Sequence, residues 1–195
     1  MSGRTLRLAI WGLVAVNVVA LAWVMVISPR MTANAAGKIG HGEYTLAATD
    51  GTAFTETSLS QAPSLVFFGF THCPDVCPTT LGDILTWQEA LPEARDMNIY
   101  FVTVDPTRDT GDILKDYVGW VDGVRGVTGS EEETQKALEA FGVYAARVDL
   151  GDGDYTMDHS ASVFLFDKDG NYSDRIRYQE DFDTAVGQLK ALLGT

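Results

Sequence analysis

The sequence of 195 residues predicts an α/β domain built on an open, partly parallel sheet. Two observations support this fold class. After residue 40, continuously apolar runs alternate with segments of helical periodicity, and the chain ends in a strand, a turn, a second strand and a helix. Alternating strands and helices typically place parallel strands between helices on both faces, and a final hairpin adds antiparallel strands. We therefore expect a hairpin, three strand–helix units, and a closing strand–strand–helix unit.

The first half of the domain has the clearest strand signals. Residues 43–59 contain two short β-prone runs around Asp50-Gly51, a pattern typical of a hairpin. Residues 64–70 (SLVFFGF) are continuously apolar, as in a strand buried on both faces of a sheet. Apolar residues then recur at helical spacing from Leu81 to Leu91, which predicts a helix after this strand.

The middle of the chain repeats this alternation. Residues 98–105 (NIYFVTVD) predict a second buried strand, residues 110–120 a helix, and residues 124–129 a short third strand. Ser130 and Glu133 have the spacing of a capping box, in which each side chain binds a free amide group of the other residue. A helix should therefore begin there.

The C-terminal region predicts a hairpin and a helix. Residues 162–178 contain two strand-like runs separated by the turn sequence Lys168-Asp169-Gly170. Residues 182–193 have the periodicity of an amphipathic helix.

The N-terminus differs in kind. Residues 6–27 contain about 20 apolar residues, enough at about 1.5 Å per residue to cross a bilayer core of about 30 Å. A cleavable signal peptide is the alternative, since residues 33–35 (ANA) resemble a cleavage site, but the apolar run exceeds the usual 7 to 15 residues. We expect a membrane anchor over residues 1–28, a linker over 29–39 and one domain over 40–195.

Charge predicts the orientation of this anchor. Arg4 and Arg7 precede the apolar run, against Arg30 and Lys38 after it, so the positive-inside rule favours an N-terminus inside the cell. The protein is then expected to cross the cytoplasmic membrane once, with its domain facing the periplasm.

The domain itself is strongly acidic. Residues 1–38 hold four of the 14 basic residues and none of the 27 acidic ones, which leaves ten basic and 27 acidic residues and a net charge of −17. Such a surface repels nucleic acid and anionic lipid, so binding to nucleic acid is excluded.

The only two cysteines, Cys73 and Cys77, follow the first buried strand directly. Pro78 is tolerated only in the first turn of a helix, so the helix should start near Pro74 or Asp75 and place Cys77 at its N-terminus. There, free amide groups and the helix dipole favour a thiolate, the form that both metal binding and thiol exchange require.

Several chemistries could use this pair. A structural disulfide would stabilise by only about 2 kcal/mol because the loop is short. Thioredoxin-type pairs have two residues between the cysteines, whereas Cys73 and Cys77 have three. Two thiolates leave a soft metal short of ligands, and an imidazole completes copper or zinc sites. His159, just before the strand at residue 162, is the strongest candidate, ahead of His72 beside the cysteines and His41 in the linker.

Three blocks of this sequence, GFTHCPDVCPTTL, VTVDPTRDT and DHSASVFLFDKDG, closely resemble the signatures of the Sco/SenC family. The resemblance implies a membrane-anchored copper protein with a thioredoxin-like fold that helps to assemble the binuclear copper centre of cytochrome c oxidase. It places the copper ligands on Cys73, Cys77 and His159. We expect one copper ion per chain, as Cu(I) or Cu(II), delivered rather than used in catalytic turnover.

The resemblance also implies partners: the copper-bearing subunit of cytochrome c oxidase, a thiol reductant and another copper chaperone. Asp105, Arg108 and Asp109 match the second block, either as positioning or docking residues or as a turn with a helix cap, while Asp158 could orient His159. Two other functions remain open on the sequence: a membrane-anchored thiol:disulfide reductase acting on oxidase cysteines, and a copper or redox sensor.

Overall fold

The computed structural model describes residues 3–27, 37–60 and 62–195, and its contacts divide the chain into Met1–Lys38 and Ile39–Thr195. The first unit contains helix α1 (Gly3–Ala22), which continues into a π-helical turn at Trp23–Ile27. Over the described ranges, no helix combines the length and the apolarity of a membrane span. Most of the expected linker, residues 28–36, lies outside the described residues.

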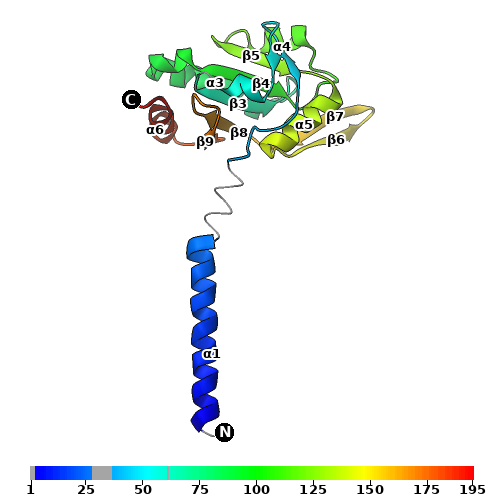
Figure 1. Ribbon diagram of the computed structural model, residues 1–195. Helices are drawn as coiled ribbons and strands as arrows, with labels where there is room; N and C mark the ends of the chain where they lie inside the picture. The colour runs from blue at the N-terminus through cyan, green and yellow to red at the C-terminus, as the bar shows by residue number, and fades with distance from the viewer. Residues whose placement is uncertain (1–2, 28–36, 61) are drawn as a thin grey trace. The chain divides into compact units, whose positions relative to one another are not determined.

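The second unit is built on one mixed sheet (Figure 1). Within the described residues this sheet has seven strands in the order β2-β1-β5-β4-β3-β8-β9. The central strands β3, β4 and β5 are parallel, while β1 and β8 pair antiparallel to β5 and β3. Their bounds are β1 (Leu46–Ala48), β2 (Ala53–Phe54), β3 (Ser64–Gly69), β4 (Asn98–Thr103), β5 (Val124–Thr128), β8 (Ser162–Phe166) and β9 (Tyr172–Arg177).

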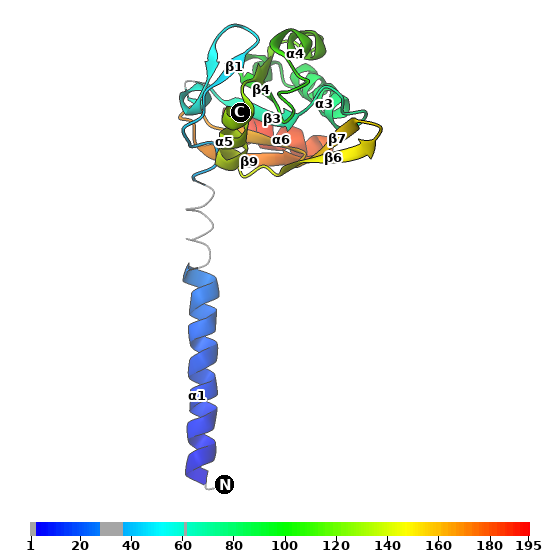
Figure 2. The same ribbon diagram turned by 90° about the vertical axis from the view of Figure 1, so that its right-hand side faces the viewer.

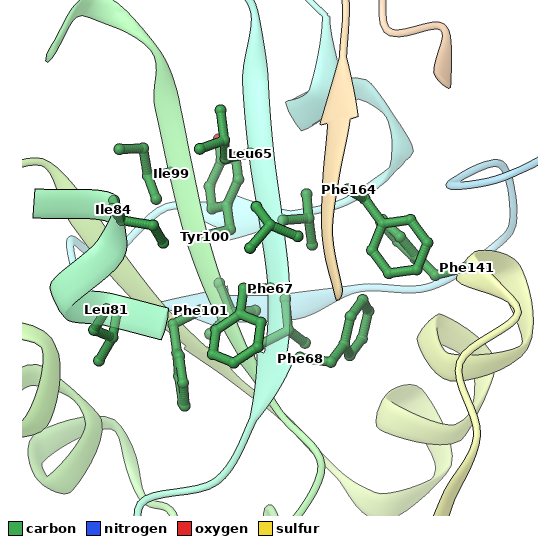
Figure 3. Close-up of a cluster of buried hydrophobic side chains, with 14 of the residues drawn as sticks. Leu65, Phe67, Phe68, Leu81, Ile84, Ile99, Tyr100, Phe101, Phe141 and Phe164 are labelled. Carbon is green, nitrogen blue, oxygen red and sulfur yellow. The ribbon is translucent and has the colours of Figure 1, made fainter. Parts of the chain in front are cut away.

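Helices cover both faces of the sheet, as alternating strands and helices require. They are α3 (Val76–Ala90), α4 (Gly111–Val118), α5 (Glu131–Phe141) and α6 (Phe182–Leu193). On one face, the Phe101 ring of β4 lies 5.5 Å from Phe67 of β3 and 5.5 Å from Tyr117 of α4. Leu81 and Ile84 of α3 lie on this side in Figure 3, and α6 contacts α3.

Helix α5 covers the other face. Its Phe141 ring lies 5.0 Å from Phe68 of β3 and 5.8 Å from Phe164 of β8, on the side of the sheet opposite Phe67 (Figure 3). Alternation of side chains along β3 thus supplies both layers of the core, because successive residues point to opposite faces. The expected α/β fold with a partly parallel sheet is confirmed.

Helix α5 begins where the capping pattern predicted. The Ser130 hydroxyl accepts a hydrogen bond from the Glu133 amide at 3.1 Å. The Glu133 carboxylate, however, accepts from the Thr45 amide at 2.6 Å. The Ser130 side chain therefore caps the helix as expected. The Glu133 side chain instead binds the segment before β1 and attaches the helix to it.

One pair of strands was not predicted. No element was assigned to residues 143–161, but β6 (Ala145–Gly151) and β7 (Asp154–His159) form an antiparallel hairpin there, a separate two-stranded sheet visible in Figure 2. Asp152 and Gly153 both have positive φ, so the turn between the strands is left-handed. His159 is thus the last residue of a strand rather than part of a connection.

Candidate metal site

The structure brings the three expected ligands together. One ligand atom from each of Cys73, Cys77 and His159 lies within 4.8 Å of the others. Among the described residues, this is the one group of three His, Cys, Asp or Glu side chains placed to hold a metal ion. Both cysteines are free thiols.

The cysteines are positioned by the junction of β3 and α3. The Cys73 amide donates to the Phe70 carbonyl at 3.2 Å, which closes a turn after the strand. Helix α3 starts at Val76, so Cys77 is its second residue, and the Cys77 amide donates to Cys73 Sγ at 3.4 Å. The expected place of Cys77 at a helix N-terminus is confirmed, and a free amide of that terminus contacts the other sulfur.

Gly69 makes room for the buried sulfur. A Cβ atom at this last residue of β3 would lie 2.8 Å from Cys77 Sγ and 2.9 Å from the Phe101 ring. Cys77 is fully buried, so the sulfur has no free space into which to retreat. Only glycine lets the strand end this close to the helix that carries Cys77.

Burial changes the acid–base chemistry expected of Cys77. It raises the pKa of the Cys77 thiol far above its ordinary value, and a backbone hydrogen bond with Phe70 opposes this by less. The expected thiolate is therefore wrong for the metal-free site, because desolvation outweighs the helix N-terminus. A metal ion must displace this proton when it binds.

His159 presents one ring nitrogen to the sulfurs. Its Nδ1 lies 3.0 Å from the Ser160 carbonyl, which can only accept, so Nδ1 carries the proton and Nε2 is left as the free ligand atom. Nε2 lies 3.8 Å from Cys77 Sγ. Burial lowers the pKa of His159, which favours the neutral ring that a metal requires.

A buried carboxylate fixes the turn that leads to the cysteines. Asp109 accepts hydrogen bonds from the Thr71 amide at 3.0 Å, the Thr71 hydroxyl at 2.6 Å and the Thr103 hydroxyl at 2.6 Å. Its side chain is fully buried, and these bonds satisfy both oxygens. Asp109 therefore holds the turn between β3 and the cysteines.

With this geometry established, comparison with known proteins identifies the family. A model of the family described as SCO1/SenC matches residues 32–194. The chain belongs to the SCO1/SenC family. The predicted family is therefore confirmed.

Sequence relatives and solved structures match most of this SCO1/SenC chain. A SCO2-like protein of Rickettsia prowazekii is 40% identical over 139 residues, 69% of this chain and 67% of that protein. The structure of Bradyrhizobium japonicum ScoI with copper bound is 39% identical, with a TM-score of 0.71 over 79% of this chain and 99% of its own. Yeast Sco1 with copper bound is 29% identical, with a TM-score of 0.72 over 81% and 90%. The expected thioredoxin-like fold is confirmed.

The other candidate residues of this SCO1/SenC chain lie apart from the three ligands. His41 pairs with Glu56 at 3.0 Å, and His72 is exposed, with Nδ1 3.1 Å from the Thr71 hydroxyl. Asp158 is exposed and adjoins His159 on a strand, so the two side chains point to opposite faces.

Tyr155, on the strand that carries His159, was not singled out from the sequence. Tyr155 is four residues before His159 on β7, and its hydroxyl donates to Asp105 at 3.0 Å. Tyr155, Met157 and His159 alternate with Thr156 and Asp158, but this run is too short and too polar to indicate a strand clearly.

Proposed function

We propose that this chain is a copper metallochaperone, which binds one copper ion through Cys73 Sγ, Cys77 Sγ and His159 Nε2 and delivers it to the binuclear copper centre of cytochrome c oxidase. The convergence of these three ligand atoms within 4.8 Å is the observation that carries the proposal. The copper-bound structures of relatives support the choice of metal.

The three ligand atoms suit a copper ion that is bound and later released to a partner. Two thiolates and one imidazole satisfy Cu(I) in trigonal geometry, whereas Cu(II) would recruit a water or carboxylate as a further ligand. Cys73 is partly exposed and Cys77 is buried, so one side of the site opens to solvent and to a partner's ligands. A cargo ion held in this way can leave by exchange of one ligand at a time.

The proposal names partners by the chemistry that each step requires. The acceptor is the copper-bearing subunit of the oxidase, and a solved relative is described as a member of the Sco family of cytochrome c oxidase assembly proteins. A disulfide between Cys73 and Cys77 would remove two ligands, so a thiol reductant must act before loading. Another copper chaperone would supply the ion.

Anaerobic titration of the reduced full chain in detergent with Cu(I) tests this function. We expect saturation at one copper per chain, with the ion retained against a competing Cu(I) chelator, because two thiolates and an imidazole form a soft binding site. No retained copper in fully reduced protein would contradict the proposal. Zn²⁺ offered in the same way serves as the comparison metal.

We further propose that residues 1–28 anchor the chain in the cytoplasmic membrane, residues 29–39 form a linker, and residues 40–195 lie in the periplasm. The apolar run of residues 6–27, the exposed large apolar side chains of α1 between Ile10 and Leu21, and the basic residues before them support this. We expect the protein to sediment with membranes, resist carbonate extraction and be digested by protease added to spheroplasts. Membrane-extracted protein whose N-terminal sequence begins at Ala36 would indicate cleavage instead.

A further inference from the structure

Tyr155 is held from both sides of its ring. The Arg108 guanidinium lies over the ring with its Cζ 3.7 Å from the centroid, and the Arg147 guanidinium lies with its Cζ 3.8 Å from the centroid. Stacked guanidinium groups attract an aromatic face, and more strongly when water is excluded. The Tyr155 hydroxyl also donates to Asp105 Oδ1 at 3.0 Å.

Of the groups that hold Tyr155, Arg147 belongs to β6 of the hairpin itself, whereas Asp105 and Arg108 lie outside the hairpin, after β4. Asp105 follows β4, is buried, and accepts a hydrogen bond from Arg108 Nε on its other oxygen. Arg108 Nη1 in turn donates to the Tyr155 carbonyl at 2.9 Å, so the backbone of β7 is bound as well as the ring. This partly buried ion pair therefore attaches the hairpin to the end of β4.

The hairpin needs contacts with the rest of the domain to be stable. It forms a two-stranded sheet of its own, which is marginally stable in isolation. A cavity of about 230 Å³ separates it from α5 and from the segment after β4, with Thr134, Leu138, Pro106 and Met157 among its lining residues. Because this space is not filled by side chains, the contacts of Tyr155 add to the packing of Met157 and Ala145 against the core.

His159 is the last residue of the same strand, and its ring also packs edge-on against Phe70 after β3, with centroids 5.7 Å apart. His159 is four positions after Tyr155 in β7, so the two side chains lie on one face of the strand. The two sulfurs do not depend on the hairpin, because β3 and α3 position them. A shift of the hairpin relative to the central sheet would therefore move the imidazole and leave the thiols in place.

We propose that Tyr155 is a positioning residue for the copper site, which holds β7 at the end of β4 so that His159 Nε2 stays beside Cys77 Sγ. This inference rests on the proposed function. It predicts that Tyr155 acts on copper through His159 alone.

A double-mutant cycle in the reduced full chain tests this. Tyr155→Leu removes the ring and its hydroxyl, so we expect Cu(I) affinity, measured by chelator competition, to fall about tenfold or more. In the His159→Ala background the same change should have no further effect. With Cu(II), the nitrogen coupling in the electron paramagnetic resonance spectrum should be lost or weakened in Tyr155→Leu, as in His159→Ala.

Two further variants complete the design. Tyr155→Phe keeps the ring between the guanidinium groups and removes only the hydrogen bond to Asp105, so we expect a smaller loss of Cu(I) affinity. If Tyr155→Leu does not fold, Tyr155→Phe tests the inference in the same double-mutant cycle. Tyr144→Leu alters an exposed tyrosine directly before β6 and should leave affinity unchanged. Full affinity in the Tyr155 variants, or equal losses with and without His159, would overturn the inference while wild-type binding still supports the proposed function. Absence of wild-type binding would instead reject the proposed function.

Discussion

Replacing Cys77 with alanine should abolish tight copper binding. Cys77 supplies one of the two soft ligands, so its loss leaves only one sulfur and one imidazole for the ion. We expect Cu(I) affinity to fall at least a hundredfold, about 2.8 kcal/mol or more, measured by chelator competition and by copper content after desalting.

Gly82→Ala is the matched control for this variant. It lies on the same helix α3, and a Cβ atom added there meets nothing within 4 Å. It also exchanges a poor helix former for a good one, so folding should be unchanged or slightly improved. Unchanged stoichiometry and affinity in Cys77→Ala would show that copper binds elsewhere.

The parts of the fold that the sequence predicted are those with strong local signals. Strand β3 is apolar at nearly every residue because both of its faces are buried, and this pattern is visible without knowing any partner. Helix α6 occupies Phe182–Leu193, the same residues as its apolar periodicity. Pro78 placed the start of α3, because proline fits a helix only in its first turn.

The β6–β7 hairpin lacked such a signal. Its strands contain Arg147, Asp149 and Asp158, and most of its residues are exposed, so neither face is continuously apolar. Its attachment depends on contacts between residues 47 and 50 apart in the chain, from Arg108 and Asp105 to Tyr155. Pairing over such separations is set by the tertiary fold, and short-range periodicity contains no information about it.

The sequence predicted which residues form the site, but it did not predict how burial changes their protonation. The spacing of Cys73 and Cys77 and the position of His159 before β8 selected the three side chains that converge. The predicted thiolate form of Cys77 was wrong, because burial raises the pKa of this thiol and only the folded chain establishes that burial. The balance between a helix N-terminus and desolvation must therefore be read from a structure.

His159→Ala should distinguish copper delivery from dithiol exchange. Imidazole completes an S₂N copper site, whereas exchange between Cys73 and Cys77 does not require it. Losing one of three ligands should weaken Cu(I) binding by well over tenfold, more than about 1.4 kcal/mol. The variant should still form and reduce its disulfide, which thiol trapping measures. His41→Ala, which removes an exposed histidine paired with Glu56, is the matched control and should bind copper normally.

In cells, the same variant should affect the oxidase. If the chain delivers copper through Cys73, Cys77 and His159, a chromosomal His159→Ala strain should assemble cytochrome c oxidase with a depleted binuclear copper centre, and added copper should restore part of its activity. If the chain acts as a thiol:disulfide reductase, oxidase copper and activity should stay normal, because the two thiols of the variant still cycle. Normal oxidase copper content in this strain without added copper would reject delivery through this site and favour the reductase.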